Sequence, residues 1–222
     1  MSVSPSGSSP RQGRFITFEG GEGTGKSTQV ERLVTALERA GLTVVATREP
    51  GGTPGGEDIR ALLVRGEVAR WEPMSEAILN YAARFEHLEK KIRPALAAGS
   101  WVVSDRFADS TTAYQGYGHG LDLGQIADLH RAVVGDFAPD LTLMLDIPVE
   151  AGLKRATAGA DGGEDRYERM DKAFHERLRQ GFLDIAAKNP ARCAVVDAAG
   201  TPEEVSTRIF EIVQARLGVS LL

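Results

Sequence analysis

The sequence predicts an α/β protein with a mostly parallel sheet and helices on both faces of that sheet. Short apolar runs typical of strands alternate along the chain with longer segments of helical periodicity. Each helical segment is long enough to form the right-handed crossover that joins two parallel strands. The chain has 222 residues, of which 42% are hydrophobic, so it can bury one full core.

Five runs predict the strands, because they are short, apolar and mostly rich in β-branched residues. They are Phe15–Phe18, Thr43–Thr47, Trp101–Ser104, Leu141–Leu145 and Cys193–Val196. In an open parallel sheet, ligands bind outside the carboxyl ends of the strands. We therefore expect the chemistry of this chain to lie directly after each of these runs.

Helices are predicted where apolar residues recur every three or four positions. The expected spans are 26–41, 57–65, 74 to about 94 or 99, 123–133, 149–157, 170–185 and 202–217. Thr201 and Glu204 have the spacing of a capping box, with Pro202 at the first helical position. Residues 158–165 (AGADGGED) form a glycine-rich acidic loop.

Composition limits the domain organisation and the partners. Residues 1–13 are rich in Ser, Pro and Gly and are predicted to be a flexible tail, and 14–218 a single domain. The net charge of −5 argues against nucleic acid as a partner. No apolar run has the length of a membrane span, so a cytoplasmic protein is expected. The four histidines show no metal-ligand spacing and are predicted to be surface or packing residues.

A phosphate-binding loop follows the first predicted strand. The segment from Gly20 to Ser27 (GGEGTGKS) fits the pattern G-x-x-x-x-G-K-[ST] between a strand and a helix. Its glycines let backbone N–H groups turn inward onto phosphate oxygens. The Lys26 ammonium is expected to reach the β- and γ-phosphates, and the Ser27 hydroxyl a Mg²⁺ ion. A GTPase is not expected, because the guanine-reading N-K-x-D is absent.

Charged residues follow three further strands. Arg48 follows the second strand and offers a planar fork to a second phosphate. After the third strand, Arg106 is placed to bridge two phosphates, and Asp105 to hold Mg²⁺ directly or through water. After the fourth, Arg155 and Arg166 flank the acidic loop, which suggests a lid over about 155–168.

The motifs FEGxEGxGKST, TREPGGT, YAAR, DRxxxSTxAYQG and PDLTLxLD occur in this order over roughly residues 14–217. In this, the chain resembles the bacterial thymidylate kinases. The resemblance implies a three-layer P-loop kinase fold with a five-stranded parallel sheet, a lid and a homodimer. It also implies transfer of the γ-phosphate of ATP to dTMP, with Mg²⁺, for dTTP synthesis.

Site residues follow from the resemblance position by position. For ATP these are Gly20, Gly21, Glu22, Gly23, Thr24, Gly25, Lys26, Ser27 and Thr28, with Arg155 stacked on adenine. For dTMP they are Glu22 at the 3′-hydroxyl, Arg48 and Arg106 at the phosphate, Arg84 at the thymine edge, Thr111, Tyr114 and Gln115 around base and sugar, and Pro50 in a cis peptide with Glu49. Gly23 stands where eukaryotic members carry an arginine, and Arg166 is the lid cation expected to replace it. Lys26, Asp105, Arg106 and Arg166 are thus the expected catalytic residues.

Two other hypotheses remain open. Asn80 occupies the position where the family usually has an aromatic residue stacked on thymine, which leaves room for a kinase of another nucleoside monophosphate. A nucleotide-binding module without catalysis is the other, although the joint presence of Lys26, Ser27, Asp105 and Arg106 speaks against it.

Overall fold

The computed structural model describes residues 13–158 and 166–221, and a five-stranded sheet lies at its centre. All the strand pairs are parallel and the strand order is β2-β3-β1-β4-β5. The strands are β1 (Phe15–Glu19), β2 (Val44–Arg48), β3 (Trp101–Asp105), β4 (Leu141–Asp146) and β5 (Cys193–Asp197). The predicted fold class and the five predicted strands are therefore confirmed.

The central strands are buried on both faces, as their nearly continuous apolar runs predict. Along β1, Ile16 and Phe18 belong to one apolar cluster and Phe15 to another on the opposite face. Between them, the Thr17 hydroxyl lies 2.9 Å from the hydroxyl of Thr142 on β4. The period of two thus divides each strand between two cores.

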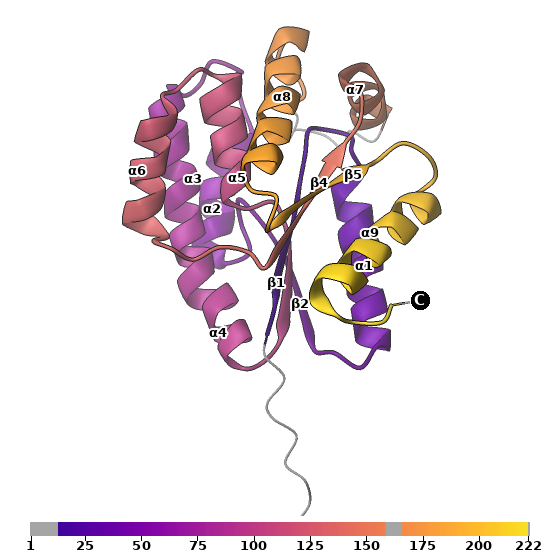
Figure 1. Ribbon diagram of the computed structural model, residues 1–222. Helices are drawn as coiled ribbons and strands as arrows, with labels where there is room; N and C mark the ends of the chain where they lie inside the picture. The colour runs from indigo at the N-terminus through magenta and orange to yellow at the C-terminus, as the bar shows by residue number, and fades with distance from the viewer. Residues whose placement is uncertain (1–12, 159–165, 222) are drawn as a thin grey trace, which may run out of the picture.

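Helices cover both faces of the sheet. Figure 1 shows α1 and α9 on one side of it and α3 and α6 on the other. The helical elements are α1 (Lys26–Arg39), α2 (Pro54–Val64), α3 (Pro73–His87), η1 (Leu88–Ile92), α4 (Arg93–Ala97), α5 (Ala108–Thr111), η2 (Thr112–Gly118), α6 (Leu123–Val133), α7 (Val149–Ala158), α8 (Lys172–Lys188) and α9 (Pro202–Leu217). The capping box predicted at Thr201 and Glu204 is present at the start of α9.

Two helical features differ from the prediction. The segment 108–118 after β3 is helical, first as α5 and then as the π-helical η2, although its Ser, Thr and Gly content gave no helical pattern. α2 begins at Pro54 rather than Glu57, because the Thr53 side chain accepts a hydrogen bond from Gly56 N and caps the helix.

The packing of α8 against η2 requires glycine on both elements. A Cβ at Gly181 would lie 2.6 Å from the Tyr117 ring, and one at Gly118 would lie 2.5 Å from the Phe174 ring. The Tyr117 atoms concerned are its Cβ and Cγ, which cannot swing away. The two backbones therefore approach each other closely only because these side chains are missing.

None of the helices in the described part of the chain combines the length and apolar character that a bilayer crossing requires. The predicted tail, residues 1–13, lies outside the described residues except for Gly13, and so does the centre of the predicted lid.

We predict that Gly181→Ala lowers the free energy of unfolding by about 1–3 kcal/mol, because the new methyl group overpacks the contact with Tyr117. Urea denaturation measures this change. Gly55→Ala on α2 is the matched control: its Cβ would meet only ordinary contacts at 3.7 Å or more, so stability should stay equal or rise by up to about 1 kcal/mol. Equal stability of Gly181→Ala and the wild type would contradict the close approach of α8 and η2.

Candidate active site

The loop between β1 and α1 is shaped by glycines in left-handed conformations. Gly20, Gly23 and Gly25 have φ angles of 136°, 66° and 85°. A Cβ at Gly23 would lie 1.9 Å from the carbonyl oxygen of Gly152 on α7, and one at Gly152 would lie 2.6 Å from that of Glu22. The loop therefore lies backbone to backbone against α7 and ends at the positive N-terminus of α1.

Lys26 is held inside this loop by the loop itself. Its Nζ donates to the carbonyl oxygens of Gly20 at 3.2 Å and Gly21 at 2.8 Å, and to the Thr24 hydroxyl at 3.3 Å. Burial, followed by the nearby Arg106 guanidinium, lowers the pKa of Lys26 to about 8. The ammonium is thus held in place by neutral oxygen atoms, in surroundings where burial and the Arg106 cation disfavour its charge.

Ser27 and Asp105 meet across the carboxyl ends of the strands. The Ser27 hydroxyl donates to Asp105 Oδ2 at 2.8 Å. A hydroxyl and a carboxylate are the hard oxygen donors that Mg²⁺ prefers. In the described residues, no group of three or more His, Cys, Asp or Glu side chains is arranged to hold a metal, so a Mg²⁺ ion here would need phosphate and water oxygens as well.

Arg106 adopts a strained backbone conformation. Its φ is 72°, and no other non-glycine residue in the described ranges has a positive φ. The conformation is fixed by Arg106 N, which donates to Phe18 O at 2.9 Å, and by the Ser104 hydroxyl, which donates to Arg106 O at 2.8 Å. The guanidinium then donates to Gly20 O, Ser110 Oγ and Glu22 Oε1 at 2.9, 3.1 and 3.2 Å.

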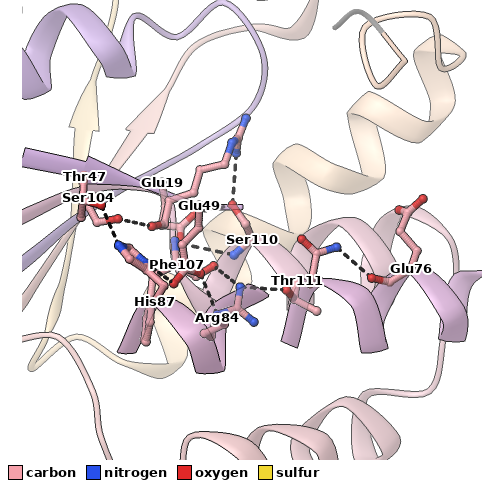
Figure 2. A network of polar contacts seen from close by, with 12 residues as sticks. Glu19, Thr47, Glu49, Glu76, Arg84, His87, Ser104, Phe107, Ser110 and Thr111 are labelled. Carbon is pink, nitrogen blue, oxygen red and sulfur yellow. Dashed lines mark hydrogen bonds and ion pairs between the residues drawn. The ribbon is translucent and has the colours of Figure 1, made fainter. Parts of the chain in front are cut away.

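Beneath Arg106 lies a fully buried carboxyl group, Glu19. It accepts hydrogen bonds from Phe107 N at 2.8 Å and from the Ser110 hydroxyl at 2.6 Å (Figure 2). Burial, followed by the nearby Asp109, raises the pKa of Glu19 to about 8. Glu19 therefore holds the turn that presents Arg106 to the site.

The carboxyl end of β2 brings Arg48 to the same place. Its side chain is 53% exposed and donates to Glu57 Oε2 at 3.0 Å. The peptide bond between the two residues that follow, Glu49–Pro50, is cis, as the resemblance implies.

Three hollows lie in a row along the phosphate-binding loop. The central cavity, about 350 Å³, is lined by residues that include Lys26, Ser27, Arg48, Asp105 and Arg106. The inner pocket, about 110 Å³, shares Glu22 and Arg106 with it and continues to Pro50, Asn80, Thr111, Tyr114 and Gln115. The outer pocket, about 370 Å³, shares Gly23, Gly25 and Thr28 with it and contains Thr24 and Arg155.

The wall between the central cavity and the inner pocket is built from three side chains. Arg106 lies over the Tyr114 ring, 5.0 Å from its centroid, and the Tyr114 hydroxyl donates to Glu22. Burial alone would raise the pKa of Glu22, but Arg106 and Lys26 outweigh it and lower that pKa. Glu22 therefore stays a carboxylate that can accept hydrogen bonds.

A buried polar network supports the inner pocket from the side of β2 and α3 (Figure 2). Glu49 accepts from Arg84 Nε at 2.8 Å and lies 2.9 Å from His87 Nδ1, whose ring reaches Thr47 at 2.6 Å. Arg84 also donates to the Thr111 hydroxyl at 3.1 Å, yet its Nη1 is buried without a hydrogen-bond partner in the described structure. A buried donor left unpaired is costly, so Arg84 Nη1 fits the role of a ligand contact.

Gln115, by contrast with Arg84, has an unpaired acceptor rather than an unpaired donor. Its Nε2 donates to Glu76 Oε1 at 2.6 Å, while its Oε1 is buried without a partner in the described ranges. Gln115 lines the inner pocket, whereas Arg84 does not line it but contacts the lining residues Glu49 and Thr111. One unpaired acceptor, on Gln115, and one unpaired donor, on Arg84, therefore lie close to this pocket.

Arg155, expected at adenine, lines the outer pocket. Its Nη1 donates to the carbonyl oxygen of Ala198 at 3.1 Å, on the loop after β5. The guanidinium is therefore held at the edge of the outer pocket.

The structure does not bring Arg166 to the central cavity, contrary to the expectation of a lid cation. The side chain is fully buried, and Nη1 lies 2.5 Å from Glu76 Oε2. The guanidinium also donates to the carbonyl oxygens of Leu63, Glu67 and Val68 at 3.1, 3.1 and 2.9 Å. With all its nitrogens engaged, Arg166 ties the C-terminal end of the predicted lid to α2 and α3 and does not line the central cavity.

Several residues of the site were missed in the sequence. They are Glu19, Glu76, His87, Ser110 and Tyr167. His87 was expected to be a surface or packing residue, but it is fully buried within the polar network. Only the motif F-E-G could have drawn attention to Glu19, since no pattern in the sequence pairs these side chains with their partners.

Comparisons with known proteins give the family. The thymidylate kinase family model matches residues 18–209. The thymidylate kinase of Caulobacter vibrioides is 53% identical over 208 residues, which cover 94% of this chain and 99% of that protein. That of Rhizorhabdus wittichii is 50% identical over 200 residues, covering 90% and 96%.

A solved structure agrees with this result. The crystal structure of thymidylate kinase from Ehrlichia chaffeensis superposes with a TM-score of 0.75 at 36% identity, covering 91% of this chain and 100% of that one. The sheet order, the phosphate-binding loop and the matched length all lead to one conclusion: the chain belongs to the thymidylate kinase family.

Proposed function

We propose that the chain transfers the γ-phosphate of ATP to dTMP, giving ADP and dTDP. The observation that carries this proposal is the row of three hollows, with Lys26, Arg48 and Arg106 around the middle one. A donor nucleotide bound through the outer pocket and an acceptor bound in the inner pocket would direct their phosphates into the same cavity. Such an arrangement serves phosphoryl transfer, which depends on positioning and charge neutralisation.

Each side chain then has a physical role in the reaction. An oxygen of the acceptor phosphate attacks the γ-phosphorus while the bond from that phosphorus to the β,γ-bridging oxygen breaks and ADP leaves. Lys26 neutralises the donor phosphates, and Arg48 binds the acceptor phosphate. Arg106 lies where it can contact the donor and the acceptor phosphates. Glu22 accepts a hydrogen bond from the 3′-hydroxyl of the acceptor, and Arg155 packs on the adenine.

The inner pocket supports a thymine base as its occupant. Thymine presents the O4 acceptor beside the N3–H donor. These groups match the unpaired donor on Arg84 and the unpaired acceptor on Gln115. Because Asn80 also lines this pocket, uracil or another base remains the second candidate, and the acceptor assay below decides between them.

Mg²⁺ is the metal that we propose for the central cavity, with ATP as co-substrate. Ser27 and Asp105 are the side chains that would hold it, directly or through water. When bound, the ion neutralises the β- and γ-phosphates and polarises the bond that breaks.

The nucleotide substrates suggest the cytoplasm as the compartment, which cell fractionation can check. We further propose that residues 14–218 act as one domain and that the lid lies over about 155–168; limited proteolysis with and without nucleotides would locate both.

We predict that the purified chain releases ADP with dTMP faster than with dUMP, dCMP, AMP or GMP. A coupled ADP-release assay measures this, and omission of Mg²⁺ should abolish turnover.

Arg106→Ala should lower kcat with dTMP at least about 10²-fold, because it removes charge stabilisation from the transition state.

Lys91→Ala on η1, a half-buried lysine outside the three hollows, is the control and should keep wild-type kcat. Faster turnover of another monophosphate would favour the second candidate. ATP binding without turnover of any acceptor would leave only a nucleotide-binding module.

The lowered pKa of Lys26 predicts a pH dependence of ATP binding. Since phosphates prefer the charged ammonium, ATP binding should take up a proton once the pH exceeds about 8. The dissociation constant should be flat just below this value and rise above it by up to about tenfold per pH unit. Calorimetry in two buffers of different ionisation enthalpy at pH 9 measures the proton uptake.

Lys26→Arg supplies the control, because a guanidinium stays charged throughout this range. ATP binding to Lys26→Arg should show neither the proton uptake nor the rise of the dissociation constant above pH 8. A wild type that takes up no proton at pH 9 would contradict the lowered pKa of the buried Lys26 beside Arg106.

We also propose a homodimer that forms through α3. Ile78 and Phe85 are seven residues apart on one face of this helix and are 51% and 49% exposed, and Leu62 on the adjacent α2 is 40% exposed. A second copy covering this apolar face would remove it from water.

We predict that the wild type sediments as a dimer and Phe85→Glu as a monomer, whereas Val195→Glu, at an exposed apolar residue on β5, stays dimeric. Monomeric wild type would exclude the proposal.

A further inference from the structure

Glu76 on α3 is a buried carboxylate outside the phosphate-binding machinery. Its side chain is 1% exposed, yet each of its oxygens meets a different partner. Oε1 accepts from Gln115 Nε2 at 2.6 Å, and Oε2 lies 2.5 Å from Arg166 Nη1. Glu76 therefore connects the inner pocket, through Gln115, with the buried guanidinium of Arg166.

This contact decides which way the Gln115 amide points. A free amide can turn its carbonyl and its NH₂ group either way. A carboxylate only accepts hydrogen bonds, so Glu76 must face the NH₂ group, and the carbonyl of Gln115 must point away from it. That carbonyl oxygen is the unpaired acceptor associated with the inner pocket.

Arg166 holds Glu76 in place from the side opposite Gln115. Its guanidinium is fully buried and is fixed by three backbone carbonyl oxygens. Because this fixed cation lies 2.5 Å from Glu76 Oε2, the carboxylate is held in one position beside Gln115.

The helical register places this contact beside the base-binding guanidinium. On α3, Glu76, Asn80 and Arg84 follow one another at intervals of four, so they share a face. Across from them, Gln115 contacts Glu76, and Thr111, four residues earlier, contacts Arg84. Figure 2 shows two separate contacts, one between Arg84 and Thr111 and one at Glu76. Thr111 and Gln115 thus contact α3 on either side of Asn80.

We propose that Glu76 is a positioning residue that sets the base specificity of the inner pocket by fixing the orientation of the Gln115 amide. With the amide fixed, the pocket offers a donor to O4 and an acceptor to N3–H, as thymine and uracil require. Cytosine presents the opposite pair, an N4 amino donor and an N3 acceptor, and would leave buried groups unpaired. The inference rests on the proposed function and adds to it the reason why cytosine is rejected.

The test compares dTMP and dCMP as acceptors for the full-length wild type and for Glu76→Gln. The new amide at position 76 can donate as well as accept, so Gln115 can turn over. The ratio of kcat/KM for dTMP to that for dCMP should fall at least about tenfold, mainly through KM, while KM for ATP stays within about twofold. Glu86→Gln, at a partly exposed position of the same helix, should leave the ratio unchanged.

A double-mutant cycle separates this role from a structural one. If Glu76 acts through Gln115, then Glu76→Gln should not change the ratio further in a Gln115→Leu background. An unchanged ratio in folded Glu76→Gln, or an equal loss in both backgrounds, would overturn the proposal. So would a wild type that uses dCMP within about tenfold of dTMP, a measurement that does not depend on folding of the variant. A wild type inactive on dTMP would instead overturn the proposed function.

Discussion

The site depends on two cations, the buried Lys26 and the partly buried Arg106, that lie close to each other and to the carboxylates of Glu22 and Asp105. Lys26 and Arg106 disfavour each other's charge, which is one reason why the pKa of Lys26 is lowered. Glu22 and Asp105 offset this repulsion, and Glu22 contacts Arg106 directly at 3.2 Å. Positive charge is therefore already in place around the central cavity before any phosphate binds, so that binding needs little rearrangement.

The strained backbone of Arg106 belongs to the same arrangement. Its left-handed conformation costs roughly 1–2 kcal/mol, which surrounding hydrogen bonds must offset. Glu19 and Ser104 provide them on either side of the residue. The backbone conformation that presents the Arg106 guanidinium thus depends on Glu19 and Ser104, neither of which lines the central cavity or the inner pocket.

The sheet and the loop at Gly20–Ser27 could be predicted because their signals are local. Strand periodicity, glycine spacing and position after a strand are all readable within ten residues, and the strand ends then bring Arg48 and Arg106 together. The partners of buried side chains are not local: Glu76 meets Gln115 and Arg166, which are far away in the sequence. For this reason Glu76 went unnoticed, and Arg166 was assigned to the phosphates when its hydrogen bonds attach it to α2 and α3.

The close contact of Gly23 and Gly152 has a consequence for how such a chain can change. A Cβ at Gly23 would collide with the carbonyl oxygen of Gly152, and one at Gly152 with that of Glu22, so the atoms in the way belong to the backbone. An arginine at position 23, as in eukaryotic members, would not fit unless α7 began farther from the loop. A substitution at position 23 alone therefore cannot place a cation in the loop, because α7 would have to move as well.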